Sequence, residues 1–217
     1  MRTRIIATAL IVSSGLLVTP SHARPYRTDA AGTAAPGNIE FEAGADYWSD
    51  KTSLGFNLKQ GITSRMDLGF HFNDAIVPDS TRTFSNATLS AKFDLVPTLA
   101  SVAFTGALGG SAYTVNGALT KAWGPFKASA DLGGNFTAGA RDADLSWGAN
   151  PSYTFGPATL GAELRGNQHE ANWWQTAVQL KLADWIALDA GLGDDFSKNK
   201  NDWHVATGIW IALPAVK

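Results

Sequence analysis

The histidines and the missing cysteines set the chemistry that is open to this chain. It has four histidines and no cysteine, so it holds neither a thiolate nucleophile nor a zinc–thiolate site. A serine hydrolase needs a histidine and an orienting partner beside its serine, and no G-x-S-x-G motif is present. His71 and His204 lie in alternating segments, whereas His169 stands beside Glu170 in a polar stretch. We therefore predict that the chain is not an enzyme, and a lipid-modifying enzyme built around His169 is the weakest alternative.

The acidic residues near the C-terminus do not predict a metal site. Asp194, Asp195 and Asp202 enclose an oxygen-rich segment, and oxygen ligands suit calcium. The ordered ligand spacing of an EF-hand loop is missing from this segment. No metal and no cofactor is predicted.

Most charged residues occupy every second position of short segments, with apolar residues between them. Residues 38–48 read N-I-E-F-E-A-G-A-D-Y-W, which puts Ile39 and Phe41 on one face and the glutamates on the other. A period of two is specific to β-strands. We expect the polar face to line an interior space together with Asp94 and Lys127. Its principal members are Glu40, Glu42, Asp46, Lys59, Asp67, His71, Lys92, Asp131, Glu163, Arg165, Lys181, Asp189 and His204.

The elements that position these residues are about twelve alternating segments, an even number as single-chain bacterial barrels require. Connections after the even segments are tight, as at 61–65 and 96–99, and those after the odd segments are longer, as at 73–85 and 193–202. Short periplasmic turns and longer extracellular loops are typical of outer-membrane barrels. We predict an all-β fold, a transmembrane up-and-down antiparallel β-barrel over residues 38–217.

The N-terminus predicts export to the cell outer membrane. Arg2 and Arg4 precede an apolar run, and Ser21 and Ala23 occupy the minus-three and minus-one places of a signal-peptidase site. We predict a cleaved signal peptide at 1–23 and an N-terminal periplasmic segment at 24–37. The sequence leaves open whether that segment enters the barrel as a plug or hangs as a tail.

Charge and composition limit the partners that we expect. The formal net charge of −2 gives no reason to expect nucleic acid. The expected partners are outer-membrane lipid, the barrel-insertion machinery and a small-molecule solute.

The tryptophans allow a second test of a membrane barrel, because indole rings gather at both water–lipid boundaries. We expect two aromatic girdles, one beside the longer connections and one beside the tight turns. The first comprises Trp48, Trp147, Trp173, Trp174 and Trp203, and the second comprises Trp123 and Trp185. The alternative is a soluble β-sandwich, whose aromatic residues would pack in an apolar core.

Three segments resemble a family of bacterial outer-membrane proteins labelled "MetA-pathway of phenol degradation". Thr28–Thr33 with Pro36-Gly37 resembles the N-terminal signature of that family. Gly61–Gly69 resembles its first periplasmic turn, and Asp184–Gly193 resembles its penultimate strand. The resemblance covers nearly the whole mature chain and implies a transport or channel protein for hydrophobic or aromatic compounds. It assigns no substrate residue.

Two functional hypotheses follow from these patterns. The first is a passive channel or transporter for small molecules, with a water-filled polar lumen. The second is a structural or surface-interaction barrel whose lumen is plugged by its own side chains. At about twelve strands the interior lies between filled small barrels and open porins, so the strand count does not separate the two.

Overall fold

The computed structural model describes residues 29–48, 52–76, 83–139, 142–169, 172–196 and 203–215, without the side chains of 73–76 and 83–86. The predicted signal peptide at 1–23 and residues 24–28 lie outside the described residues. The described chain forms twelve strands: β1 (Ile39–Tyr47), β2 (Thr52–Thr63), β3 (Met66–Ile76), β4 (Thr83–Val96), β5 (Ala100–Ala107), β6 (Ala112–Trp123), β7 (Phe126–Thr137), β8 (Asp144–Phe155), β9 (Ala158–Asn167), β10 (Trp173–Ala183), β11 (Ile186–Asp195) and β12 (His204–Leu213). None of the described residues forms a helix long and apolar enough to cross a membrane.

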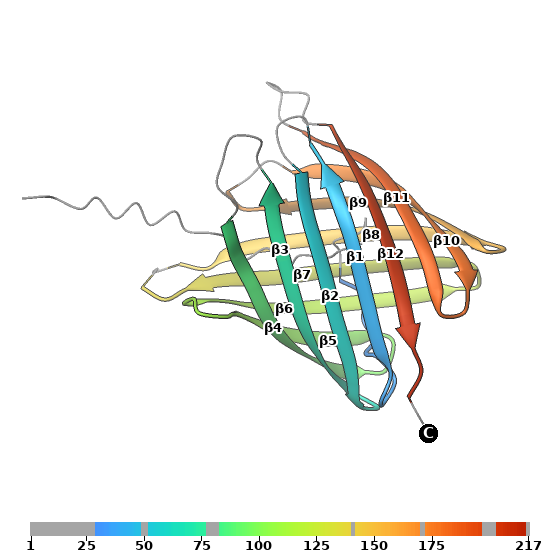
Figure 1. Cartoon of the computed structure of the whole chain (residues 1–217), viewed down its shortest axis with the longest axis horizontal. Helices are drawn as coiled ribbons and strands as arrows, with labels where there is room; N and C mark the ends of the chain where they lie inside the picture. Colours follow the sequence, from blue (N-terminus) through green and yellow to red (C-terminus); the bar gives the residue numbers. More distant parts are fainter. Residues whose placement is uncertain are drawn as a thin grey trace, which may run out of the picture.

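The strands form one closed antiparallel barrel (Figure 1). Each strand pairs with its neighbours in the sequence, and β1 pairs with β12 along a seam from Ile39↔Leu213 to Tyr47↔Val205. Closure leaves no edge strand with unpaired N–H and C=O groups, which hydrocarbon cannot satisfy. The predicted all-β up-and-down barrel and its strand count are confirmed.

The two ends of the barrel differ in the length of their connections, as predicted. Connections after even strands are short, such as 64–65 and 124–125, and those after odd strands are longer, up to 196–203. We call these ends the turn end and the loop end. The loop predicted at 73–85 is too long, because β3 and β4 continue into it and leave 77–82 between them. Polar residues can extend a strand because the ladder uses backbone groups alone.

The wall of the barrel has polar side chains inside and apolar side chains outside. Glu163 and His204 are each 1% exposed, whereas Leu132 is 64% exposed. The buried hydrophobic residues of the described chain are all alanines: Ala34, Ala118, Ala177, Ala187 and Ala206. A soluble β-sandwich would bury its large aliphatic residues between two sheets, so that alternative is wrong. An apolar outer face is the surface that a bilayer favours.

Candidate functional site

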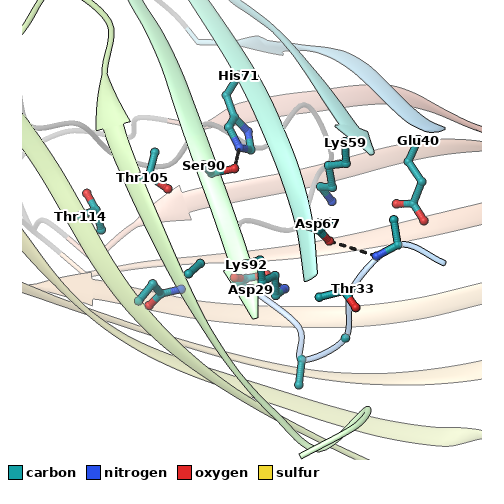
Figure 2. A pocket seen from close by; sticks show the side chains of 15 residues that line it. Asp29, Thr33, Glu40, Lys59, Asp67, His71, Ser90, Lys92, Thr105 and Thr114 are labelled. Carbon is teal, nitrogen blue, oxygen red and sulfur yellow. Dashed lines mark hydrogen bonds and ion pairs between the residues drawn. The ribbon is translucent and has the colours of Figure 1, made fainter. Parts of the chain in front are cut away.

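Residues 29–37 lie along the inner side of the wall near its turn end, and Figure 2 shows Asp29 and Thr33 of this segment beside the wall. We call residues 29–37 the inner segment. Pro36 forms a parallel bridge with Gly61 of β2, and the Gly37 N–H donates to the Gly61 carbonyl at 2.8 Å. A Cβ at Gly61 would lie 2.0 Å from the Ala35 carbonyl oxygen, so glycine alone permits this approach. The described part of 24–37 is therefore inside the barrel and is not a free tail.

Polar contacts hold the inner segment to three wall strands. Three hydrogen bonds reach β3, β4 and β6: Ala34 N–H to Asp67 Oδ2 at 3.0 Å, Thr33 Oγ1 to Asp94 Oδ2 at 3.4 Å, and Ala31 N–H to Thr120 Oγ1 at 2.8 Å. The Lys92 ammonium donates to the Asp29 carboxylate at 2.7 Å and also to the Ala30 carbonyl. The segment therefore occupies part of the lumen cross-section on this side of the barrel.

A cavity of about 300 Å³ is lined by the inner segment on one side and by residues of β1–β6 on the other (Figure 2). Charged groups of both signs line it, including Glu40, Lys59, Asp67 and Lys92. The Lys59 ammonium lies 3.3 Å from Glu42 Oε1 on the neighbouring strand β1, so Lys59 forms an ion pair within the wall. The cavity is consequently polar and suited to water and small hydrophilic groups.

His71 and Ser90 face each other in the same cavity. His71 Nε2 and Ser90 Oγ are 2.8 Å apart, and Figure 2 shows the pair pointing into the lumen from β3 and β4. That distance suits a nucleophile and its base. A lipid-modifying enzyme would need such a pair at the outer rim, whereas His71 is 8% exposed inside the barrel. We assign the pair to the polar lining.

The opposite wall carries an aromatic cluster around His204 of β12. His204 Nε2 lies 3.0 Å from Gln175 Oε1, the Trp48 ring stacks on the imidazole at 4.3 Å, and Trp173 meets it edge-on at 5.8 Å. The Arg165 guanidinium lies 6.0 Å from the Trp173 ring centre, within cation–π range. The cluster lies toward the loop end and combines aromatic faces with charge.

Two of the tryptophans predicted in the aromatic girdle, Trp48 and Trp173, do not lie at the lipid boundary. Both were predicted at the lipid boundary, and both instead contact His204 on the inner face. The physical reason is strand parity, since each lies an even number of positions from an inward residue, Asp46 and Gln175 respectively. Trp147 (40% exposed), Trp203 (46%), Trp123 (54%) and Trp185 (52%) are exposed, and Trp174 packs edge-on against Trp203 at 5.7 Å.

The other predicted lumen residues lie on the inner face of the wall. Asp189 is 6% exposed and Glu42 is 2% exposed, while Asp46 and Asp131 are half-buried. Lys181 differs because it stands at the turn-end rim, where its ammonium lies 2.7 Å from the fully exposed Asp184 carboxylate. That hydrogen bond lowers the pKa of Asp184. Lys181 therefore lies at the mouth of the lumen rather than along its length.

Neutral polar residues that were not among the predicted lumen residues form much of the lining. Asn57 is fully buried, Gln175 is 1% exposed, and Asn116 donates to Asp131 Oδ2 at 3.2 Å. The predicted lumen residues were all ionisable, although strand parity also places these amides on the inner face. Asp29 was missed for another reason, since it precedes the first alternating segment and no pattern places it inside.

Among the described residues, no group of three or more histidine, aspartate or glutamate side chains could hold a metal ion. The chain matches no protein-family model and no curated protein sequence.

Several solved structures have a fold similar to that of this chain. The chain is similar to the KdgM porin, with a TM-score of 0.62 and 10% sequence identity over 81% of this chain and 99% of the porin. The NanC porin gives a TM-score of 0.60 and 11% identity over 81% and 100% of the two chains. An outer membrane channel from Pseudomonas putida F1 gives a TM-score of 0.57 and 14% sequence identity, over 85% of this chain and 98% of the channel. At such low identity the likeness shows that the chain has the fold of these outer-membrane barrels, and it does not confirm the MetA-pathway family.

Proposed function

We propose that the protein is a passive outer-membrane channel for small molecules. The observation that carries this proposal is the cavity between the inner segment and β1–β6, lined by Lys59, Asp67 and Lys92 inside an apolar-faced barrel. Such a lining is suited to contact with water and polar solutes, whereas the apolar outer face is suited to contact with lipid. The porins and the channel to which the fold is similar support the same function.

The proposal includes the orientation and partners of the chain. Residues 1–23 are a signal peptide that is removed on export, the turn end faces the periplasm, and the loop end faces outward. The barrel-insertion machinery places the barrel in the membrane, where lipid covers the apolar face.

Aromatic compounds are the solutes that the family resemblance suggests. One observation supports them: Trp48 and Trp173 present rings on the inner face near the loop end. Aromatic rings attract one another in stacked and edge-on arrangements at centroid separations of about 4.5–7 Å. We include small aromatic molecules among the proposed solutes for this reason.

A plugged structural barrel is the second candidate. It is favoured by the inner segment, which Lys92 and Asp67 bind from the wall, and by the large buried side chains on the opposite side. Such a barrel would use its interior network for rigidity rather than for passage.

Planar-bilayer recording of the refolded mature protein separates the two candidates. A narrow channel gives discrete single-channel steps of small conductance, because the inner segment occupies part of the cross-section. A complete lack of steps from correctly folded protein would reject the channel and favour the plugged barrel. Heat-modifiable mobility on gels supplies the check that the barrel has folded.

A further inference from the structure

Carboxylates outnumber basic side chains on the inner face of the described wall. Glu42, Asp131, Glu163 and Asp189 project inward near the middle of β1, β7, β9 and β11. The lysines lie nearer the turn end, at positions such as Lys59 and Lys92. The central part of the lumen is therefore acidic.

The loop end repeats this imbalance. Asp46 lies near the last residue of β1, Asp144 begins β8, and Asp195 ends β11. Arg165 carries an inward guanidinium in this half of the described wall, and its Cζ lies 6.0 Å from the centre of the Trp173 ring. A solute that passes this part of the described wall meets these inward carboxylates.

Three of the inward lysines are each paired with one carboxylate. Lys59 lies 3.3 Å from Glu42, and Lys92 lies 2.7 Å from Asp29. Lys181 is paired with Asp184 outside the barrel wall. Each lysine carries a single positive charge, so these pairs leave the inward carboxylates of the described wall in excess.

Several inward carboxylates are instead bonded to neutral donors. Asp67 accepts from the Ala34 N–H, Asp94 from the Thr33 hydroxyl, and Asp131 from the Asn116 amide. A neutral donor satisfies an oxygen without cancelling its charge. In addition, the buried Oδ1 atoms of Asp94 and Asp131 accept no hydrogen bond within the described structure, and Asp94 is 9% exposed. The negative charge of these carboxylates acts on a passing cation through the field that it produces in the lumen.

We infer that the lumen selects cations over anions. Inward carboxylates are the feature that makes a pore cation-selective, and low-dielectric walls focus their field along the path. This inference rests on the proposed channel and names its substrate class, which is inorganic and small organic cations. The inward carboxylates of the described wall raise the local concentration of cations in the lumen.

The test is the reversal potential of the refolded mature protein in a planar bilayer under a KCl gradient at slightly alkaline pH. We expect the sign that potassium permeation produces. We also expect the selectivity to fall as the total salt is raised, because a Debye length of about 10 Å at 0.1 M shrinks to about 3 Å at 1 M. A purely steric filter would not respond to salt in this way.

Asp131→Asn removes one inward carboxylate with almost no change in shape. We expect it to shift the reversal potential toward zero while steps remain visible, and Asp94→Asn provides a second variant should the first fail to fold. Lys121→Gln is the control, because Lys121 of β6 is exposed and follows the inward Thr120, which places it on the outer face. The control should keep the wild-type reversal potential.

The outcomes separate the inference from the proposed function. Steps with a reversal potential near zero or of the chloride sign would overturn cation selectivity and leave the channel intact. Selectivity that is unchanged in both Asp131→Asn and Asp94→Asn would equally overturn the assignment to these carboxylates. A folded protein without steps would reject the channel, and selectivity with it.

Discussion

The Lys92 ammonium lies 2.7 Å from the Asp29 carboxylate and ties the inner segment to β4. The two side chains are 14% and 18% exposed, so bulk water screens the pair only partly. Lys92 also donates to the Ala30 carbonyl, which places its charge between two acceptors of the same segment. Pairs shielded in this way couple more strongly than exposed ones.

Lys92→Gln and Asp29→Asn should therefore destabilise the barrel non-additively. We expect a coupling energy of about 1 kcal/mol, within the range for contacting residues. The measurement is a double-mutant cycle on the free energy of unfolding in guanidinium, recorded by tryptophan fluorescence in phospholipid vesicles. Both single variants should also raise the single-channel conductance, because the segment is released from one wall contact.

Lys181→Gln and Asp184→Asn form the matched control cycle. Their ion pair has the same 2.7 Å separation, but Lys181 is 52% and Asp184 98% exposed. We expect no resolvable coupling and no change in conductance. Equal coupling in the two cycles would contradict the role given to burial of the Lys92–Asp29 pair.

Gly61→Ala should displace the inner segment without removing any charge. The new methyl group would lie 2.0 Å from the Ala35 carbonyl oxygen, which is backbone and cannot rotate away. We expect larger conductance steps and faster protease cleavage within residues 24–37, while the barrel keeps its folded gel mobility. Proteolysis followed by mass spectrometry locates the cut.

Gly117→Ala serves as the control for that substitution. A Cβ at Gly117 would have Leu132 O at 3.9 Å, which is ordinary contact, and it would point outward. Conductance and cleavage should match those of the wild type. If Gly61→Ala also behaved as wild type, the close approach between the inner segment and β2 would be refuted.

Strand periodicity predicts most of the fold. The alternation of Ile39, Glu40, Phe41 and Glu42 predicts both the strand and its two faces, because successive side chains must point to opposite sides. Loop limits were harder to predict, since Asn73 is polar yet still pairs with Asn86 through the backbone. Polarity marks exposure to water and does not mark the end of hydrogen bonding.

The interior contacts could not be predicted to the same degree. Parity indicates that His204 and Trp48 face inward, but their stacking depends on the register across the β1–β12 seam. The contact between Asp29 and Lys92 is harder still, because it joins residues 63 positions apart through a segment with no period. Residue type alone predicted that Trp48 and Trp173 lie at the lipid boundary, whereas their strand parity places both on the inner face.

Gln175→Leu should weaken the cluster at the loop end. His204 would lose the amide oxygen that lies 3.0 Å from its Nε2, and both residues are 1% exposed. Removing one partner of a buried hydrogen bond costs about 1–3 kcal/mol. The free energy of unfolding in vesicles measures this loss.

Gln60→Leu is the control for the change of side chain, because Gln60 is exposed on the outer face of β2. An apolar residue there meets lipid, so stability should be unchanged or slightly higher. Equal losses in the two glutamine variants would contradict the assignment of Gln175 to the interior.

Leu132→Arg tests whether the outer face crosses the hydrocarbon core. Leu132 lies near the middle of β7 and is 64% exposed, so the new guanidinium would be placed in lipid. Arginine at the midplane of a barrel costs about 2–4 kcal/mol, and the cost falls to about 0–1 kcal/mol near the interfaces. Leu95→Arg is the matched variant, because Leu95 is 60% exposed and lies next to the last residue of β4 at the turn end. Unfolding titrations in vesicles should show the larger loss for Leu132→Arg, and equal losses at the two positions would contradict a membrane centred on the middle of the strands.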